Sequence, residues 1–395
     1  MKKYLQISVL ACFLFVASSC TSNEDSVRFV CESTFEVASD GDNTNYNTHG
    51  LVNNTLLVSE DIIDDDYTTG FRTIRLLALD LKTKKIKTLK EFDYDVRVWD
   101  FILVNDEVIF STISPDELDN LESRLINIQV VSSHPNTADK VIDQGLIYNF
   151  SKSPSFYLYD DVIYYAFESF ELENNQAVKL HQKVVKYQNF TPEVIYSFDN
   201  EVSEYTLEDD YEVMTSTELV KGFNRFGFTT RTPEGSVFYQ SIENNKFKNS
   251  KISGDIANVL LFSEDFAFDF AELGESEKYN IKSYTMTGYL GNKPTQKLPN
   301  NMGRLQPNSE ESSLVVYNGF PNDESVKSNL EGAYAGIFEL KDNKDGSNDL
   351  VITTINYEGY DQHAIPFVYR IEHKKFAIVQ FDEKENMKIS LIKQK

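Results

Sequence analysis

One repeated pattern constrains the fold of this chain more than any other feature of the sequence. The pattern is an apolar strand, a tight polar turn and a second apolar strand. Its copies begin at residues 51, 103, 158, 222, 261, 308 and 370, and they read LVNNTLLVSE, LVNDEVIFST, LYDDVIYYAF, GFNRFGFTTR, LFSEDFAFDF, NSEESSLVVY and RIEHKKFAIV. The apolar residue that follows each turn recurs every 53 residues on average. A regular repeat of this kind indicates one architecture built from similar β units.

A second hairpin follows several of these copies. The second hairpins read IRLLALDLKTKKIKTL (74–89), VVKYQNFTPEVIYSF (184–198), SVFYQSIENNKFKNSKI (236–252) and FAIVQFDEKENMKISLI (376–392). Two hairpins make a four-stranded antiparallel unit, and the repeat length is close to that of propeller blades. The sequence therefore predicts an all-β fold, a single β-propeller over residues 27–395. The count favours seven blades and leaves six or eight open, because the spacing between units is uneven.

The segment 27–37, VRFVCESTFEV, is an extra strand without a hairpin partner of its own. We expect it to supply the missing outer strand of the last unit and so to close the ring, which removes exposed edges. Cys31 lies on the apolar face of this strand, so we expect it to pack as a small hydrophobic residue.

The first 26 residues predict the cellular location of the protein. Lys2 and Lys3 precede an apolar run over residues 5–16, which is typical of a secretory signal peptide. The VASSC stretch that follows resembles the lipobox of bacterial lipoproteins. The resemblance implies cleavage after residue 19 and lipidation of Cys20, with palmitate among the acyl chains expected. Residues 1–19 would then be the signal peptide, and residues 20–26 a polar tether between the lipid and the fold.

The signal peptide and the lipobox together imply a lipoprotein of the cell envelope, held in the outer membrane. Glu24 and Asp25 resemble acidic signals that send some Gram-negative lipoproteins to the cell surface, so the periplasmic and surface-facing sides both stay open. The formal net charge of −24 repels nucleic acid and anionic headgroups. We therefore expect attachment to the membrane through the lipid anchor and no nucleic-acid partner.

As a whole, the chain resembles β-propeller lipoproteins of Gram-negative bacteria, of the TolB-like type. The resemblance covers most of residues 27–395 and rests on the strand repeat. It implies a fold and no particular chemistry, because one fold hosts many functions.

Long acidic connections between the two hairpins of a unit all fall on one face of a propeller. We expect them at 60–73, 114–123, 168–179, 272–282 and 318–334. Loops on a rigid framework commonly carry function. The candidate ligand-binding residues here are Tyr67, Tyr279 and Tyr334, whose rings could stack on sugars. The candidate metal ligands are Asp64, Asp65 and Asp66, because Ca²⁺ prefers carboxylate oxygens; a solvated acidic loop is the competing interpretation, and we expect no other cofactor.

The sequence contains no nucleophile elbow, phosphate loop or dinucleotide fingerprint, and its five histidines are scattered. The predicted innermost strands are mostly apolar, with Asp100 an exception. We therefore expect a non-enzymatic binding or scaffold module for a glycan, a peptide or an envelope protein. The alternative is a secreted carbohydrate-active hydrolase or lyase with a carboxylate pair, and a purely structural lipoprotein is the third hypothesis.

Overall fold

The computed structural model describes 28 strands, and no helix, in the residues that it places. It describes residues 29–38, 44–63, 71–93, 95–113, 125–148, 154–174 and 176–201. It continues with 217–222, 225–231, 237–243, 246–252, 259–261, 266–276, 281–290, 293–297, 305–308, 313–316, 335–342, 348–361, 364, 366–382 and 386–395. In these residues no helix is long and apolar enough to cross a membrane.

Three four-stranded units follow one another in the first half of the chain. Blade 1 contains β2 (Thr44–Val52), β3 (Thr55–Ile63), β4 (Phe71–Asp80) and β5 (Lys85–Glu91). Blade 2 contains β6 (Val98–Val104), β7 (Glu107–Ile113), β8 (Leu125–Ser133) and β9 (Lys140–Tyr148). Blade 3 contains β10 (Phe156–Tyr159), β11 (Val162–Glu173), β12 (Gln176–Gln188) and β13 (Thr191–Glu201).

The second half continues with strands that are described by their backbone pairing. One sheet contains β14 (Thr217–Gly222), β15 (Arg225–Arg231), β16 (Val237–Glu243) and β17 (Lys246–Ile252). The next contains β18 (Val259–Leu261), β19 (Phe266–Ser276), β20 (Ile281–Leu290) and β21 (Lys293–Lys297). Two hairpins follow, β22 (Leu305–Asn308) with β23 (Ser313–Val316), and β24 (Ala335–Asp342) with β25 (Asn348–Ile355). Because these hairpins pair separately, the count of seven blades stays a prediction.

The last sheet joins the two ends of the chain. We call it the closing blade; it contains β26 (Phe367–Glu372), β27 (Lys375–Phe381), β28 (Met387–Gln394) and β1 (Phe29–Val37). Strand β1 runs antiparallel to β28, from the pair Phe29↔Gln394 to the pair Val37↔Met387. The expectation that the N-terminal strand supplies the outer strand of the last unit is confirmed.

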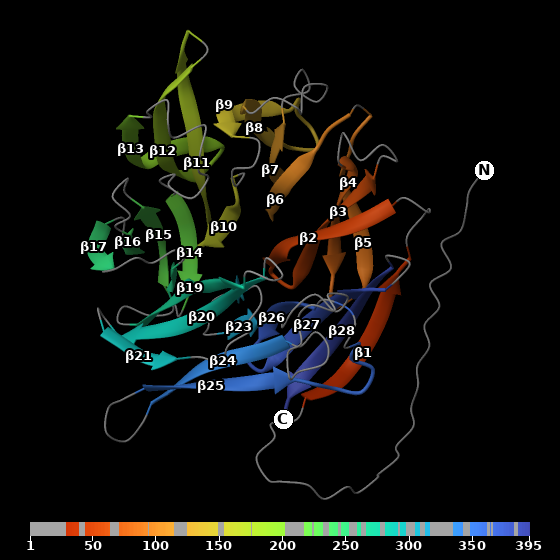
Figure 1. Ribbon diagram of the computed structural model, residues 1–395. Coiled ribbons are helices and arrows are strands. Elements are labelled where there is room, and N and C mark those ends of the chain that lie inside the picture. Colours follow the sequence, from red (N-terminus) through yellow and green to blue (C-terminus); the bar gives the residue numbers. More distant parts are fainter. Residues whose placement is uncertain are drawn as a thin grey trace, which may run out of the picture.

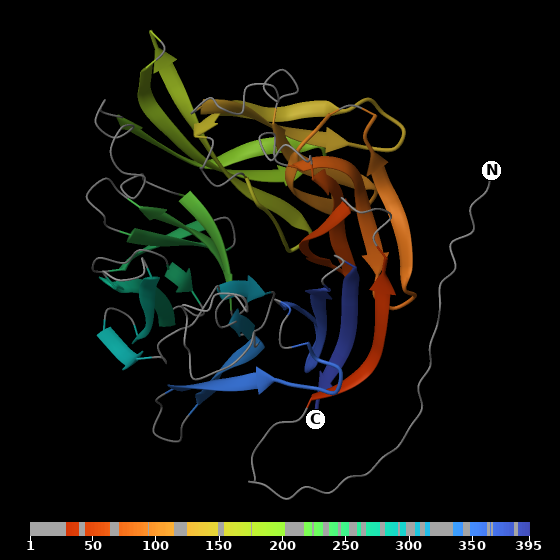
Figure 2. The same cartoon turned by 45° about the vertical axis from the view of Figure 1, so that its right-hand side comes forward.

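The sheets follow one another around a ring in chain order, and the closing blade returns to blade 1 (Figures 1 and 2). The first strands lie innermost, because β2 contacts both β6 and β26, and β6 contacts β10. All-antiparallel blades that share their faces in a closed ring make a β-propeller, so the predicted fold class is confirmed. The core lies between blades: one buried apolar cluster joins blades 1, 2 and 3, and another joins blade 1 to the closing blade.

Blades 2 and 3 approach so closely that one residue pair, Phe170↔Leu146, links them into a single eight-stranded sheet. Gly145 permits this approach, since a Cβ at this position would lie 2.5 Å from the Cβ of Ser169. The β-branched and aromatic residues of these strands suit this arrangement, because their two faces are both covered.

Two of the predicted long loops are wrong. Residues 168–179 belong mostly to β11 and β12, which are joined at residues 174–175, and most of 272–282 belongs to β19 and β20. The polar residues of 168–179 alternate with Phe170, Leu172 and Leu180, and a period of two is the pattern of a half-exposed strand. Blade 3 therefore extends beyond the ring as a long hairpin (Figure 1).

Candidate functional site

The predicted site residues lie outside the described residues. This holds for Cys20, for the acidic run Asp64, Asp65 and Asp66, and for Tyr67, Tyr279 and Tyr334. The predictions made for them remain untested. Within the described part of the chain, no group of three or more His, Cys, Asp or Glu residues could hold a metal ion.

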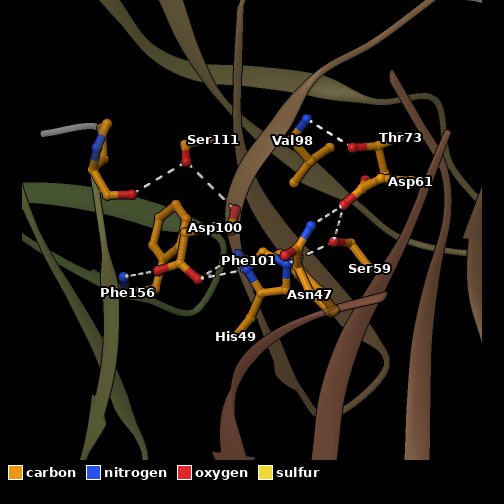
Figure 3. Close-up of polar contacts among 11 residues, drawn as sticks. Asn47, His49, Ser59, Asp61, Thr73, Val98, Asp100, Phe101, Ser111 and Phe156 are labelled. Atoms are coloured by element: carbon orange, nitrogen blue, oxygen red, sulfur yellow. Dashed lines mark hydrogen bonds and ion pairs between the residues drawn. The ribbon is translucent and has the colours of Figure 1, made fainter. Parts of the chain in front are cut away.

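The structure instead brings together a buried chain of polar side chains on the inner strands of blades 1 and 2 (Figure 3). The Ser59 hydroxyl donates to Asp61 Oδ2 over 3.0 Å, and it lies 2.9 Å from His49 Nε2. On the other side of the imidazole ring, His49 Nδ1 lies 3.2 Å from Asp100 Oδ1. We call Asp61, Ser59, His49 and Asp100 the polar chain. Ser59 and Asp61 are fully buried, and the side chains of His49 and Asp100 are 7% and 14% exposed.

Asp100 joins three blades. Besides His49 of blade 1, its carboxylate accepts the backbone N–H of Phe101 on blade 2 at 2.9 Å. Its second oxygen accepts the backbone N–H of Phe156 on blade 3, also at 2.9 Å. Three donors leave this anion well satisfied away from water, as buried charges require.

Two irregularities in the strands aim these side chains at each other. The register of β2 against β3 shifts between Thr48 and Gly50, and the register of β6 against β7 shifts between Val98 and Asp100. Gly50 has a φ of 143°, a conformation that side-chain-bearing residues rarely adopt. Bulges of this kind redirect a side chain, so His49 and Asp100 meet across the junction of the blades.

Donor and acceptor roles along the chain follow from its geometry. Ser59 has one hydroxyl proton, and this proton goes to Asp61, so the serine oxygen accepts from His49 Nε2–H. The Asp100 carboxylate can only accept from Nδ1. The imidazole ring of His49 thus links the Ser59 hydroxyl of blade 1 to the Asp100 carboxylate of blade 2. The ring also packs on Phe101 with centroids 4.8 Å apart.

Other charged groups surround the polar chain. Asp61 also accepts from the Asn47 amide at 2.5 Å. Burial lowers the pKa of Arg97, and the nearby Asp61 carboxylate opposes this shift. The guanidinium of Arg97 lies 4.3 Å from the ring centroid of Trp99, and Trp99 packs against the apolar cluster of blades 1, 2 and 3. On the closing blade, burial raises the pKa of Tyr369, and the charge of Asp100 adds to this effect.

The order Ser–His–Asp along the polar chain is the one used for acyl transfer, but the site lacks what that reaction needs. A nucleophilic serine must reach substrate and give its proton to the histidine. Ser59 is fully buried, and its proton is directed to Asp61. The arrangement therefore acts as a clasp that holds blades 1, 2 and 3 together.

Two further polar links, one buried and one half-buried, join blades 2 and 3. Tyr187 donates to Glu107 at 2.6 Å, and Ser132 donates to the same carboxylate oxygen. Lys183 lies 2.6 Å from Asp143, which also accepts from the Tyr165 hydroxyl at 3.2 Å. Burial raises the pKa of Tyr187 to about 12, and its hydrogen bond to Glu107 contributes to the shift.

Sequence reasoning noticed Asp100 as the acid on an apolar inner strand but treated His49 as one of several scattered histidines. The available signal was Gly50 directly after His49 inside a strand, because a glycine there indicates a bulge. The partner blade of His49 could not be read from the sequence.

No protein-family model and no curated protein matches this chain. Among solved structures, it is similar to the β-propeller domain of the Trilobed protease from Pyrococcus furiosus, with 8% identity and a TM-score of 0.47 over 86% of this chain and 91% of that one. It is also similar to the Pyrococcus horikoshii acylaminoacyl peptidase, with 8% identity and a TM-score of 0.44 over 86% of this chain and 58% of that one. A prolyl endopeptidase matches with 10% identity and a TM-score of 0.46 over 86% of this chain and 45% of that one. This chain thus spans about half of the two whole peptidases, and its assignment as a propeller rests on the strand pairing described above.

Proposed function

We propose that this protein is a lipid-anchored propeller of the cell envelope that acts as a binding module. Its ligand would be a glycan, a peptide or an envelope protein, held on the face where β3 leads to β4 and β7 leads to β8, whose connecting sequences are acidic. The observation that carries this proposal is that two acidic residues near the axis of the ring are buried and hydrogen-bonded. Asp61 and Asp100 are buried and hydrogen-bonded within the clasp, so they support a rigid framework and are not presented to a substrate.

Charge on the extended end of blade 3 supports the choice of face. Glu171 and Asp199 lie there on either side of His181, at 3.1 and 2.9 Å from its two ring nitrogens. The hydrogen bond from His181 lowers the pKa of Asp199, so this carboxylate stays charged. Acidic groups about half exposed to water can attract cationic groups of a ligand, although each contact in water is weak.

The binding proposal is tested by a thermal-shift screen on residues 21–395 against a panel of polysaccharides, with and without Ca²⁺. A bound ligand at 100 times its Kd adds about 2.7 kcal/mol to the free energy of unfolding. We expect a rise in Tm with one glycan class, no new reducing ends from that glycan, and loss of the rise when Tyr67 is replaced by alanine. Release of reducing ends would contradict a binding role and support a carbohydrate-active enzyme.

Lipid anchoring is tested separately with the full-length chain expressed in a Gram-negative host. We expect Cys20 to take up a labelled palmitate analogue and the protein to fractionate with membranes. The Cys20→Ala variant should lose both properties, whereas Cys31→Ala should keep them. Membrane fractionation of Cys20→Ala without label would contradict the anchor.

A further inference from the structure

The turn between β12 and β13 holds a residue that does not suit its backbone. The strands pair up to Gln188↔Thr191, so the loop has two residues, Asn189 and Phe190. Their φ angles are 51° and 61°. Positive φ at both central positions defines a type I′ turn, which prefers Asn, Asp and Gly. Phe190 therefore occupies a position that favours glycine.

Two other two-residue turns of the same kind provide the comparison. Asn53 and Asn54 join β2 to β3, and Asp160 and Asp161 join β10 to β11, all four with positive φ. Asn and Asp tolerate this conformation because their short polar side chains can bond locally, whereas a bulky side chain there is an outlier. Phe190 thus weakens the turn that contains it.

The side chain of Phe190 is not compensated by burial. It is 61% exposed, the largest value among the exposed large apolar side chains of the described residues, and Val194 on the same hairpin is 56% exposed. Residues that hold an unfavourable backbone conformation concentrate at functional positions. The exposed ring contributes little burial free energy to folding, and it would contribute such free energy to binding if a partner covered it.

Negative charge lies at the same end of the blade 3 sheet as Phe190. Asp160 and Asp161 lie in the neighbouring turn at the same end of the blade 3 sheet, and Glu193 lies three residues along β13; all three are exposed. Burial raises the pKa of Tyr164 on the neighbouring strand β11, and the charges of Asp160 and Glu193 add to this shift. Lys186, the register partner of Glu193, is the single cation among these positions.

We propose that Phe190 anchors a basic protein partner, which covers the ring with an apolar pocket rimmed by lysine and arginine. Aromatic anchors in pockets supply most of the binding energy of many interfaces. A glycan offers no positive charge to the three carboxylates, and an anionic membrane is repelled by them. The surface lies on the end of the blade that carries the β10–β11 and β12–β13 turns, opposite the face of the proposed ligand, so it adds to the proposed function and does not depend on it.

A randomised twelve-residue peptide library displayed on phage tests this proposal, with the intact protein immobilised through its N-terminus. We expect the selected peptides to carry an apolar centre flanked by lysine or arginine. Phe190→Gly should weaken their binding at least about thirtyfold, as for an interface hot spot. It should also raise the Tm by about 1–3 °C, because glycine relieves the turn.

Asn189→Gly is the matched control, since it changes the same turn and keeps the ring. Selected peptides should bind this variant as they bind the original protein, and increasing salt should weaken binding. The proposal is overturned if the library yields no binders, if its binders lack basic residues, if they bind Phe190→Gly equally well, or if Phe190→Gly lowers the Tm.

Discussion

The junction of blades 1 and 2 and the outer edge of blade 3 use polar and apolar residues in opposite ways. At the junction, Asp61 and Ser59 are fully buried. At the outer edge, Phe190 and Val194 are among the most exposed apolar residues described. Both regions are antiparallel sheet with tight turns, so secondary structure does not explain the contrast.

The difference follows from what covers each strand. Inner strands are packed between neighbouring blades, so any polar group there must find a partner, and Asp100 finds three. Strand β13 is the outermost strand of blade 3 and pairs with β12 alone among the described strands, so its outer edge and the turn before it face water. Position in the ring, rather than residue type, decides whether a side chain is buried.

The largest effect is expected at Asp100. Asp100→Ala removes the acceptor of His49 Nδ1 on blade 1 and of the backbone N–H groups of Phe101 and Phe156 on blades 2 and 3. We expect the free energy of unfolding to fall by about 3–5 kcal/mol, because each buried donor left without an acceptor costs about 1–3 kcal/mol. Urea unfolding measures the change.

Asp106→Ala is the control for Asp100→Ala. Asp106 lies in the β6–β7 turn with its side chain 75% exposed, 3.9 Å from Lys87. An exposed pair of this kind contributes at most about 1 kcal/mol. Equal losses for the two variants would show that the clasp does not hold the blades together.

A smaller effect is expected at Glu60, on the opposite face of β3 from the polar chain. Its side chain is 1% exposed, and it accepts from Arg75 Nη2 at 2.7 Å. Arg75 is 32% exposed and can turn to water when its partner is changed. Glu60→Gln should therefore lower the free energy of unfolding by about 1.5–3 kcal/mol, less than Asp100→Ala. The exposed pair of Arg72 and Asp95 gives the control, and Asp95→Asn should cost less than about 1 kcal/mol.

Tyr187→Phe removes the buried hydroxyl that donates to Glu107, and we expect it to change how the free energy of unfolding depends on alkaline pH. Loss of the bond to Glu107 should reduce the free energy of unfolding by about 1–2 kcal/mol near neutral pH. The pKa of Tyr187 is raised from 10 to about 12. A raised pKa means that this stabilisation is fully present below pH 10 and is lost as the pH rises through 12.

The original protein should therefore lose stability between pH 10 and pH 12 more steeply than Tyr187→Phe, so the gap between the two should narrow. Urea unfolding across this range, with tyrosinate absorbance as a second signal, measures it. If the difference in free energy of unfolding between the two proteins stayed constant over this pH range, the Tyr187 hydroxyl would be exposed to water and its pKa would not be raised.

The smallest effect is expected at the exposed edge. Val194→Thr replaces an apolar side chain that is 56% exposed in a strand, and threonine has a similar preference for strands. The free energy of unfolding should change by less than about 0.5 kcal/mol. Val184→Thr, which puts a hydroxyl at a fully buried position of the same blade, should cost several times more. A large loss at Val194 would mean that the outer edge is covered.

Much of the fold could be predicted from local patterns. The turns at Asn53–Asn54 and Asp160–Asp161 lie where the repeat predicts them, because short polar residues between apolar runs suit tight hairpins. The length of the blade 3 hairpin could not be predicted in this way, since Glu168, Glu171 and Glu173 look like loop residues until their strand partners are known. The expected ligand and lipid residues stay predictions, and the clasp was missed because His49 and Asp100 are 51 residues apart.

Local sequence patterns are enough to predict the all-β class, the repeat, the hairpin turns and the outer strand supplied by the N-terminal segment. These follow from alternation, turn residues and strand length, all of which act over a few neighbouring residues. Three features are visible only in the folded chain: the register of β1 against β28, the position of His49 between Ser59 and Asp100, and the exposure of Phe190 on a strained turn. These depend on closing the ring, which brings together residues that are distant along the chain and leaves the outer edges in water.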